Sequence, residues 1–241
     1  MGKHAFSLKT IYLAALTAVF AVSFFAFVAF DLYSPQRQTE QAMLEEARTF
    51  AREMDAVWQF MDNSQSIINN SSSGGYEFKG LHCSVVGKSV GRLFSAGSDY
   101  HIRYTNFDPR SEQDIPDEFE TKALEAFNAD RSVTEYYGVA PFDGEDRFRY
   151  LQALEVDDSC LECHGEPVGE LDITDHAKEG WTLESVGGAI SIVIPLDQQQ
   201  AAMRGNVIRD MAYFLLITVF IGLVILVVTT VFVLPPLGGM H

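Results

Sequence analysis

Two long apolar stretches enclose a polar middle portion of the chain. Thr10–Phe30 contains 21 residues without a charge, and Met211–Leu234 contains 24. At about 1.5 Å of rise per residue, each would cross a hydrocarbon core of about 30 Å as a helix. We therefore predict two transmembrane helices, one within residues 1–30 and one within residues 197–241.

The first stretch also has features of a cleavable signal peptide, because Lys3 and Lys9 precede it. Its apolar run exceeds the usual length of about 7 to 15 residues, and Phe27 stands where cleavage needs a small residue. An uncleaved anchor is therefore favoured. The two lysines favour a cytoplasmic N-terminus, although Arg204 and Arg209 beside the second stretch weaken this signal.

Residues 31–66 are expected to form a stalk, because Ser34–Asn63 has the periodicity of a long helix. Its apolar residues recur at alternating steps of four and three positions: Met43, Ala47, Phe50, Met54, Val57 and Met61. This heptad spacing is typical of a coiled coil, here a homodimer through the stalk helices. It equally fits an amphipathic helix packed on its own domain, and fewer than three full heptads leave both interpretations open.

Residues 67–196 alternate predicted helices, strands and loops. We expect helices at Leu81–Phe94 and Glu118–Asn128, the second with Asp117 as its cap. Strands are expected at Tyr100–Asn106, where apolar and polar residues alternate, at Phe148–Val156, and at Gly188–Leu196, which is a nearly continuous apolar run. Loops are expected at Asn69–Gly75, Asp108–Asp117 and Asp157–Val186, and a polar helix at Asp197–Asp210 leads into the second apolar stretch. This order predicts an α+β domain joined to two helices that run to the membrane.

The middle portion is strongly acidic. All 33 acidic residues and 15 of the 17 basic residues lie between Asp31 and Met211. Such a surface repels nucleic acid and anionic lipid headgroups, so we expect neither as a partner. A well-solvated exterior explains the charge more simply than docking of a basic partner does.

A cysteine motif provides the clearest chemistry. Cys160, Cys163 and His164 form C-x-x-C-H, the signature of covalent c-type haem attachment. Two thiols at this spacing reach the two vinyl groups of one porphyrin, and the adjacent imidazole turns toward the iron. Because this attachment occurs outside the cytoplasmic membrane, we predict a two-pass protein of the cell membrane whose extracytoplasmic domain carries one haem c.

Three other interpretations of the motif compete with haem. A redox-active C-x-x-C pair needs no histidine and usually begins a helix after a strand, whereas this motif is predicted in a loop. A zinc site needs a fourth ligand, which Cys83 or His176 would supply. Chance is disfavoured, because the chain has only three cysteines.

An iron held by His164 has a sixth coordination position. The possible ligands are Cys83, His82, His101, His176, Met54 and Met61. On the predicted helix His82 and Cys83 point about 100° apart, so only one of them can face the iron. Gly87, one turn below Cys83, would let a flat macrocycle approach the backbone, which favours Cys83. A buried apolar role for Cys83 and a surface position for His82 stay open.

Six segments, in this order, resemble the c-type haem family with a PAS-like sensor fold: Leu81–Lys88, Ile102–Arg110, Pro116–Glu120, Phe148–Tyr150, Cys160–Gly165 and Gly187–Ser191. The resemblance implies a central antiparallel sheet with flanking helices and the haem held against it. It also implies that Cys83 is the axial ligand opposite His164.

Members of that family commonly act as extracytoplasmic input domains of histidine kinases and chemoreceptors. Only Pro235–His241 follow the second apolar stretch here, so we expect a separate kinase or chemoreceptor partner, or a trimmed receptor.

Two porphyrin propionates require cations or hydrogen-bond donors. The residues that could supply them near these segments are Arg103, Arg110, Arg149, Tyr104 and Tyr150. Arginine is favoured for its bidentate geometry, although solvent exposure is the simpler explanation for any one arginine. No role is predicted for Lys178, Glu179 or Trp181.

The leading functional prediction is a redox or small-gas sensor. A change in haem oxidation state or binding of a diatomic gas would be passed across the membrane by the flanking helices. The alternative is a membrane-tethered monohaem electron carrier with a redox partner. An enzyme is not expected, since no second cofactor motif or acid–base pair accompanies the haem motif.

Overall fold

The computed structural model describes residues 8–228 and 231, which form two compact units. One unit contains the described residues up to Glu40 and from Asp197 onward, and the other is Gln41–Leu196. Helix α1 (Leu8–Asn63) contributes to both units. The predicted anchor and stalk are therefore parts of one unbroken helix.

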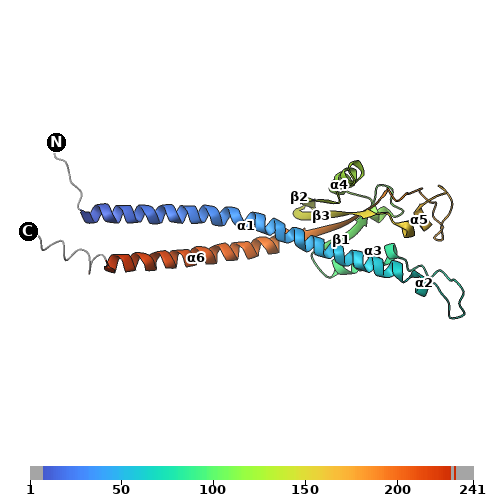
Figure 1. Cartoon of the computed structure of the whole chain (residues 1–241), viewed down its shortest axis with the longest axis horizontal. Helices are drawn as coiled ribbons and strands as arrows, with labels where there is room; N and C mark the ends of the chain where they lie inside the picture. Colours follow the sequence, from blue (N-terminus) through green and yellow to red (C-terminus); the bar gives the residue numbers. More distant parts are fainter. Residues whose placement is uncertain (1–7, 229–230, 232–241) are drawn as a thin grey trace, which may run out of the picture. The chain divides into compact units, whose positions relative to one another are not determined.

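In the first unit, the apolar part of α1 packs along α6 (Leu196–Val228). The rings of Phe27 and Phe214 stack with centroids 4.3 Å apart, and a Cβ at Gly222 would lie 3.9 Å from the ring of Phe20. Phe20 precedes Phe27 in α1, whereas its neighbour Gly222 follows Phe214 in α6, so the two segments run antiparallel (Figure 1).

One segment among the described residues, Ile208–Val228, is long and apolar enough to cross a membrane, judged by length and composition. The predicted first span contains a shorter apolar helical stretch, Ala14–Ala29. Residues 229–230 and 232–234 of the predicted second span lie outside the described part of the chain. The two-pass topology and the extracytoplasmic location stay predictions.

The second unit contains a four-stranded antiparallel sheet with the order β1-β4-β3-β2. Its strands are β1 (His101–Thr105), β2 (Glu135–Phe142), β3 (Glu145–Glu155) and β4 (Val186–Pro195). Three of them were predicted, and the α+β class is confirmed. Strand β4 lies inside the sheet and is buried from Gly188 to Pro195, which explains its nearly continuous apolar sequence.

Strand β2 was not predicted, although the sequence contains its signal. Asp143 and Gly144 join β2 to β3 in a two-residue turn and have φ angles of 51° and 83°. Phe142 pairs with Glu145 directly beside this turn. Asp-Gly favours such hairpins because both turn residues need positive φ. Pro141 and the half-exposed residues of this edge strand obscured the pattern.

Helices cover both faces of the sheet (Figure 1). Helices α1 and α3 (Cys83–Ala96) pack on one face, and α4 (Glu118–Ala129) packs on the other. As predicted, Asp117 caps α4, and it forms a capping box with Glu120. The remaining short helices are α2 (Gln65–Ile68), η1 (Glu112–Asp114) and α5 (Asp158–His164).

The heptad positions of the stalk face the sheet of their own domain. Met43, Ala47 and Met54 are at most 5 % exposed and belong to the same core as residues of β1, β3 and β4. A coiled coil through this stripe is therefore not supported, because its apolar surface is already buried within one chain. Of the two interpretations, the structure supports the amphipathic helix packed on its own domain, and a homodimer stays a prediction.

The cysteine motif lies on a helix, not in the predicted loop. Strand β3 ends at Glu155, and α5 begins at Asp158 with Asp157 as its cap. The Asp157 carboxylate accepts a hydrogen bond from the Cys160 backbone N–H at 3.1 Å. An acidic cap of this kind satisfies an amide that the first helical turn leaves unpaired.

Candidate functional site

A cavity of about 1260 Å³ lies in the second unit. Residues of α1, α3 and α5 line it, together with the segments after β1 and after α5. Typical small-molecule pockets measure about 300–1,000 Å³, so this one has room for a large ligand. All three cysteines line the cavity and none forms a disulfide.

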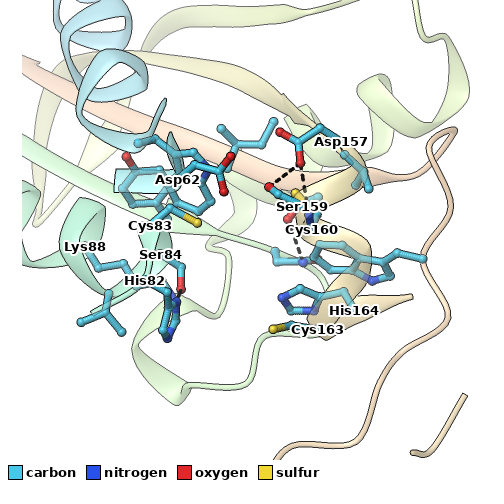
Figure 2. Close-up of a pocket in the computed structure, with 18 of the residues that line it drawn as sticks. Asp62, His82, Cys83, Ser84, Lys88, Asp157, Ser159, Cys160, Cys163 and His164 are labelled. Atoms are coloured by element: carbon cyan, nitrogen blue, oxygen red, sulfur yellow. Dashed lines mark hydrogen bonds between the residues drawn. The ribbon is translucent and has the colours of Figure 1, made fainter. Parts of the chain in front are cut away.

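Two walls of this cavity carry its metal-binding side chains. Cys160, Cys163 and His164 of α5 lie on one side in Figure 2, and His82 and Cys83 lie on the other. Helix α3 starts at Cys83. His82 was predicted to lie within this helix, but it is the N-cap residue and has an extended backbone. The structure thus brings together residues about 80 positions apart in sequence.

The other predicted axial ligands divide into two groups. His176 lines the cavity. His101, Met54 and Met61 are not among the residues of its wall. The ring of His101 packs against Phe142 with centroids 4.9 Å apart, and both methionines are at most 8 % exposed. The packing of these three side chains explains why they do not reach the cavity.

The cysteine thiols are neutral around pH 7. Burial raises the pKa of Cys83 to about 12 and that of Cys160 to about 11, and it also raises the pKa of Cys163. A redox-active C-x-x-C pair needs a lowered thiol pKa. The start of a helix after a strand does suit a redox pair, so the thiol pKa values, and not the local structure, argue against that interpretation.

A zinc site is not supported either. Among residues 8–228 and 231, no group of three or more His, Cys, Asp or Glu side chains is arranged to hold a metal ion. Structural zinc needs about four protein ligands. A haem iron needs at most two, one on each side of the macrocycle. Two facing walls with few ligands each fit the haem better.

The imidazole of His164 is held from two directions. Its Nδ1 lies 2.7 Å from Oε2 of Glu179, and its ring stacks on Trp181 with centroids 4.1 Å apart and planes 11° apart. Burial lowers the pKa of His164, although Glu179 opposes this shift. A neutral ring that donates from Nδ1 to Glu179 keeps the Nε2 lone pair for a ligand.

Arg110 in turn holds Glu179. Its Nε and Nη2 donate to the two carboxylate oxygens at 2.6 and 2.9 Å. Its Nη1 donates to Asp172 at 2.7 Å, and Nη2 also donates to the Cys163 carbonyl at 3.0 Å. Burial opposes ionisation of Glu179, but the bonds from Arg110 and His164 outweigh it and hold the Glu179 pKa below its usual value.

Most of the predicted propionate contacts do not line the cavity. Arg149 is 1 % exposed and pairs with Asp117 and Glu120. Arg103 also pairs with Glu120, and Tyr150 donates to Glu135 at 2.8 Å. These side chains join the sheet to its neighbours, which corrects the prediction for Arg103, Arg149 and Tyr150.

Arg110 and Tyr104 do line the cavity. The Arg110 guanidinium, however, is already paired with two carboxylates of the protein.

Gly87 has a different role from the one predicted. A Cβ at this position would lie 3.0 Å from the Tyr104 hydroxyl oxygen and 3.2 Å from the Trp58 ring. Both aromatic side chains line the cavity, and their centroids are 5.4 Å apart. The glycine therefore makes room for two cavity-lining aromatic rings.

Several cavity residues were missed from the sequence. They are Trp58, Asp62, Lys88, Asp172, Glu179 and Trp181. Apart from Lys88, which ends the family-like segment Leu81–Lys88, none belongs to a recognisable motif, and only the fold brings them to the cysteines. The contact between Glu179 and His164 spans 15 positions of irregular chain, for which no periodic pattern exists.

The family model described as Tll0287-like matches residues 36–195. The chain belongs to the Tll0287-like family. This Tll0287-like region runs from α1 to the end of β4 and includes the whole cavity. No curated protein matches the chain.

One solved structure that is similar to the chain is the crystal structure of the cyanobacterial heme-protein Tll0287. The TM-score is 0.47 and the sequence identity 17 %, and the match covers 63 % of this chain and 95 % of that one.

Proposed function

We propose that the second unit is a c-type haem domain that carries one haem. Cys160 and Cys163 would form the thioether bonds, and His164 would be an axial ligand. The arrangement that carries this proposal is the large cavity lined by the C-x-x-C-H residues and, across from them, by Cys83 (Figure 2). The description of the family's namesake as a heme-protein agrees with it.

Cys83 is our proposed second axial ligand, with His82 as the alternative. Both residues lie on the wall across from α5, and Nδ1 of His82 is 2.9 Å from the Ser84 hydroxyl, which leaves the Nε2 of His82 as the competing donor. Bound haem would supply a change of oxidation state and a coordination position. The thiol is protonated in the haem-free protein, so its ligation requires loss of a proton to solvent.

Intact mass spectrometry tests haem attachment directly. We expect the full chain to gain the mass of one haem when it is produced with cytochrome c maturation enzymes, and Cys160→Ser with Cys163→Ser to abolish the gain. Cys83→Ser should retain the haem mass and lose any thiolate absorption bands, whereas His82→Ala should retain both. A wild-type chain of unchanged mass would refute the proposal.

We further propose that the domain acts as a membrane-anchored redox or gas sensor without enzymatic activity of its own. Helix α1 supports this role because Asp55, Trp58 and Asp62 line the cavity, while the helix runs without a break from Leu8. A conformational change in the cavity would therefore act directly on α1, and this helix could transmit the change because it also contributes to the first unit. A kinase or chemoreceptor module, in a partner protein or in a longer receptor of which this chain is a part, would receive the signal.

Hydrogen exchange distinguishes sensing from electron transfer. We expect amides of α1 around Trp58 to exchange at different rates in the ferric, ferrous and carbon monoxide-treated forms of the full chain. Identical exchange in all forms, combined with rapid electron exchange with a redox partner, would favour the electron carrier.

A further inference from the structure

We propose that Glu179 is a positioning residue that acts through His164 and lowers the reduction potential of the bound haem. The inference rests on the proposed function, since it assigns a role to a side chain behind the proposed axial histidine. No motif marks this glutamate, and its role follows from the geometry around α5.

The segment that follows Glu179 holds His164 on several sides. The carboxylate contacts Nδ1, and Trp181 lies parallel to the ring. The backbone N–H groups of Gly180 and Trp181 both donate to the His164 carbonyl, at 2.9 and 2.7 Å. The ring therefore has little freedom to rotate, and its Nδ1 is committed to the carboxylate.

Arg110 prevents Glu179 from turning away. It binds both Glu179 oxygens and also contacts Asp172, whose side chain is 0 % exposed. The same guanidinium donates to the carbonyl of Cys163, the residue directly before His164. The Arg110 guanidinium thus connects the end of α5 to the loop that carries Glu179. This connection fixes the position of the Glu179 carboxylate relative to the His164 imidazole.

This arrangement has a predictable electronic effect. A carboxylate that accepts a hydrogen bond from Nδ1–H increases the basicity of the ring, so Nε2 donates more strongly to a metal. Stronger donation stabilises the oxidised iron more than the reduced iron, which lowers the reduction potential. Loss of the negative charge on Glu179 should therefore raise the potential even when the haem and both axial ligands stay in place.

A purely structural role for Glu179 is the competing explanation, because the ion pair with Arg110 also closes the loop. Glu179→Gln separates the two explanations. The amide has nearly the same size and an oxygen that can still accept from Nδ1, but it lacks the charge. Glu179→Asp retains the charge at a shorter reach. Glu170→Gln is the matched control, since it removes a charge from an exposed residue of the same loop.

The experiment measures the midpoint potential of the full-length holoprotein in detergent for wild type and these variants, after mass spectrometry has verified one haem in each. We expect a positive shift for Glu179→Gln, a smaller one for Glu179→Asp, and none for Glu170→Gln. Wild-type potentials in both Glu179 variants would overturn the inference and leave the proposed function intact. A wild-type chain without haem would instead overturn the proposed function, and this inference with it.

Discussion

The two walls of the cavity are fixed in position by different forces. Helix α3, which carries Cys83, packs so closely on β1 that a Cβ at Gly91 would lie 2.8 Å from the Ile102 carbonyl oxygen. Helix α5 has no fully buried residue, and its Cys160, Cys163 and His164 are only half-buried. It is held by the Asp157 cap, by the stacking of Trp181 on His164 and by the Arg110 ion pairs.

This difference affects how each wall responds to change. Close packing of backbone on backbone depends on shape and is insensitive to pH. Ion pairs depend on the protonation of each partner, and loss of one partner leaves the other buried and uncompensated. We therefore expect the α5 wall to be sensitive to charge, and the α3 wall to be sensitive to side-chain volume.

The largest expected effect comes from Arg110→Ala, which tests whether charge holds the α5 wall. Removing the guanidinium leaves the buried Asp172 carboxylate without its cation, and breaking such a pair costs about 3 kcal/mol of unfolding free energy. Urea denaturation of the full chain in detergent measures this loss. Arg92→Ala on the exposed side of α3 is the control and should change stability by less than about 0.5 kcal/mol. Equal effects of the two substitutions would contradict the comparison.

Gly91→Ala tests the packing of the α3 wall. The added methyl group would meet a backbone oxygen that cannot move independently, so we expect a loss of about 2 kcal/mol. Gly97→Ala at the end of the same helix serves as control, because the nearest atom to its Cβ would lie 3.8 Å away. The same urea denaturation reports both, and a stable Gly91→Ala protein would show that α3 can shift away from β1.

The thiols provide a kinetic contrast between the walls in the haem-free protein. Burial raises the pKa of Cys83 to about 12 and that of Cys160 to about 11, so Cys83 has the smaller thiolate fraction at pH 8. The higher nucleophilicity of the Cys83 thiolate offsets part of this difference, so alkylation by iodoacetamide, followed by peptide mass spectrometry, should modify Cys83 a few times more slowly than Cys160. Faster modification of Cys83 would mean that its wall opens more readily than the packing suggests.

The smallest expected effect is the acid sensitivity of the α5 wall. Burial opposes ionisation of Asp172, but hydrogen bonds from Thr174 and Arg110 outweigh it and lower the Asp172 pKa. The folded pKa is thus below the unfolded value of about 3.9. The stabilisation it provides is present above about pH 4 and is lost as the pH falls through the folded pKa.

Asp172→Asn should remove this part of the acid dependence. Thermal unfolding at pH 5 and pH 3 should show a smaller loss of stability in the variant than in wild type, by about 1 kcal/mol. Glu170→Gln, on the exposed part of the loop, should retain the wild-type difference. An unchanged acid dependence in Asp172→Asn would show that other carboxylates carry it.

Local patterns in the sequence predicted much of the fold. The alternation in β1, the apolar run of β4 and the Asp117 cap of α4 each act within a few residues, and all three appear in the structure. The Asp143-Gly144 turn is an equally local signal, and it was overlooked. The C-x-x-C-H motif is recognisable for the same reason, since its chemistry requires a fixed short spacing.

Which residues surround that motif was decided only by the tertiary structure. The heptad stripe of α1 fits a partner helix or a sheet equally well, and the sheet of the same domain buries it. Arg110 and Glu179 lie 69 positions apart, and an arginine in isolation gives no sign of which carboxylate it will meet. Periodicity and capping depend on residues that are neighbours in the sequence, whereas these ion pairs join residues that only the tertiary fold brings together. The support behind His164 is therefore visible only in three dimensions.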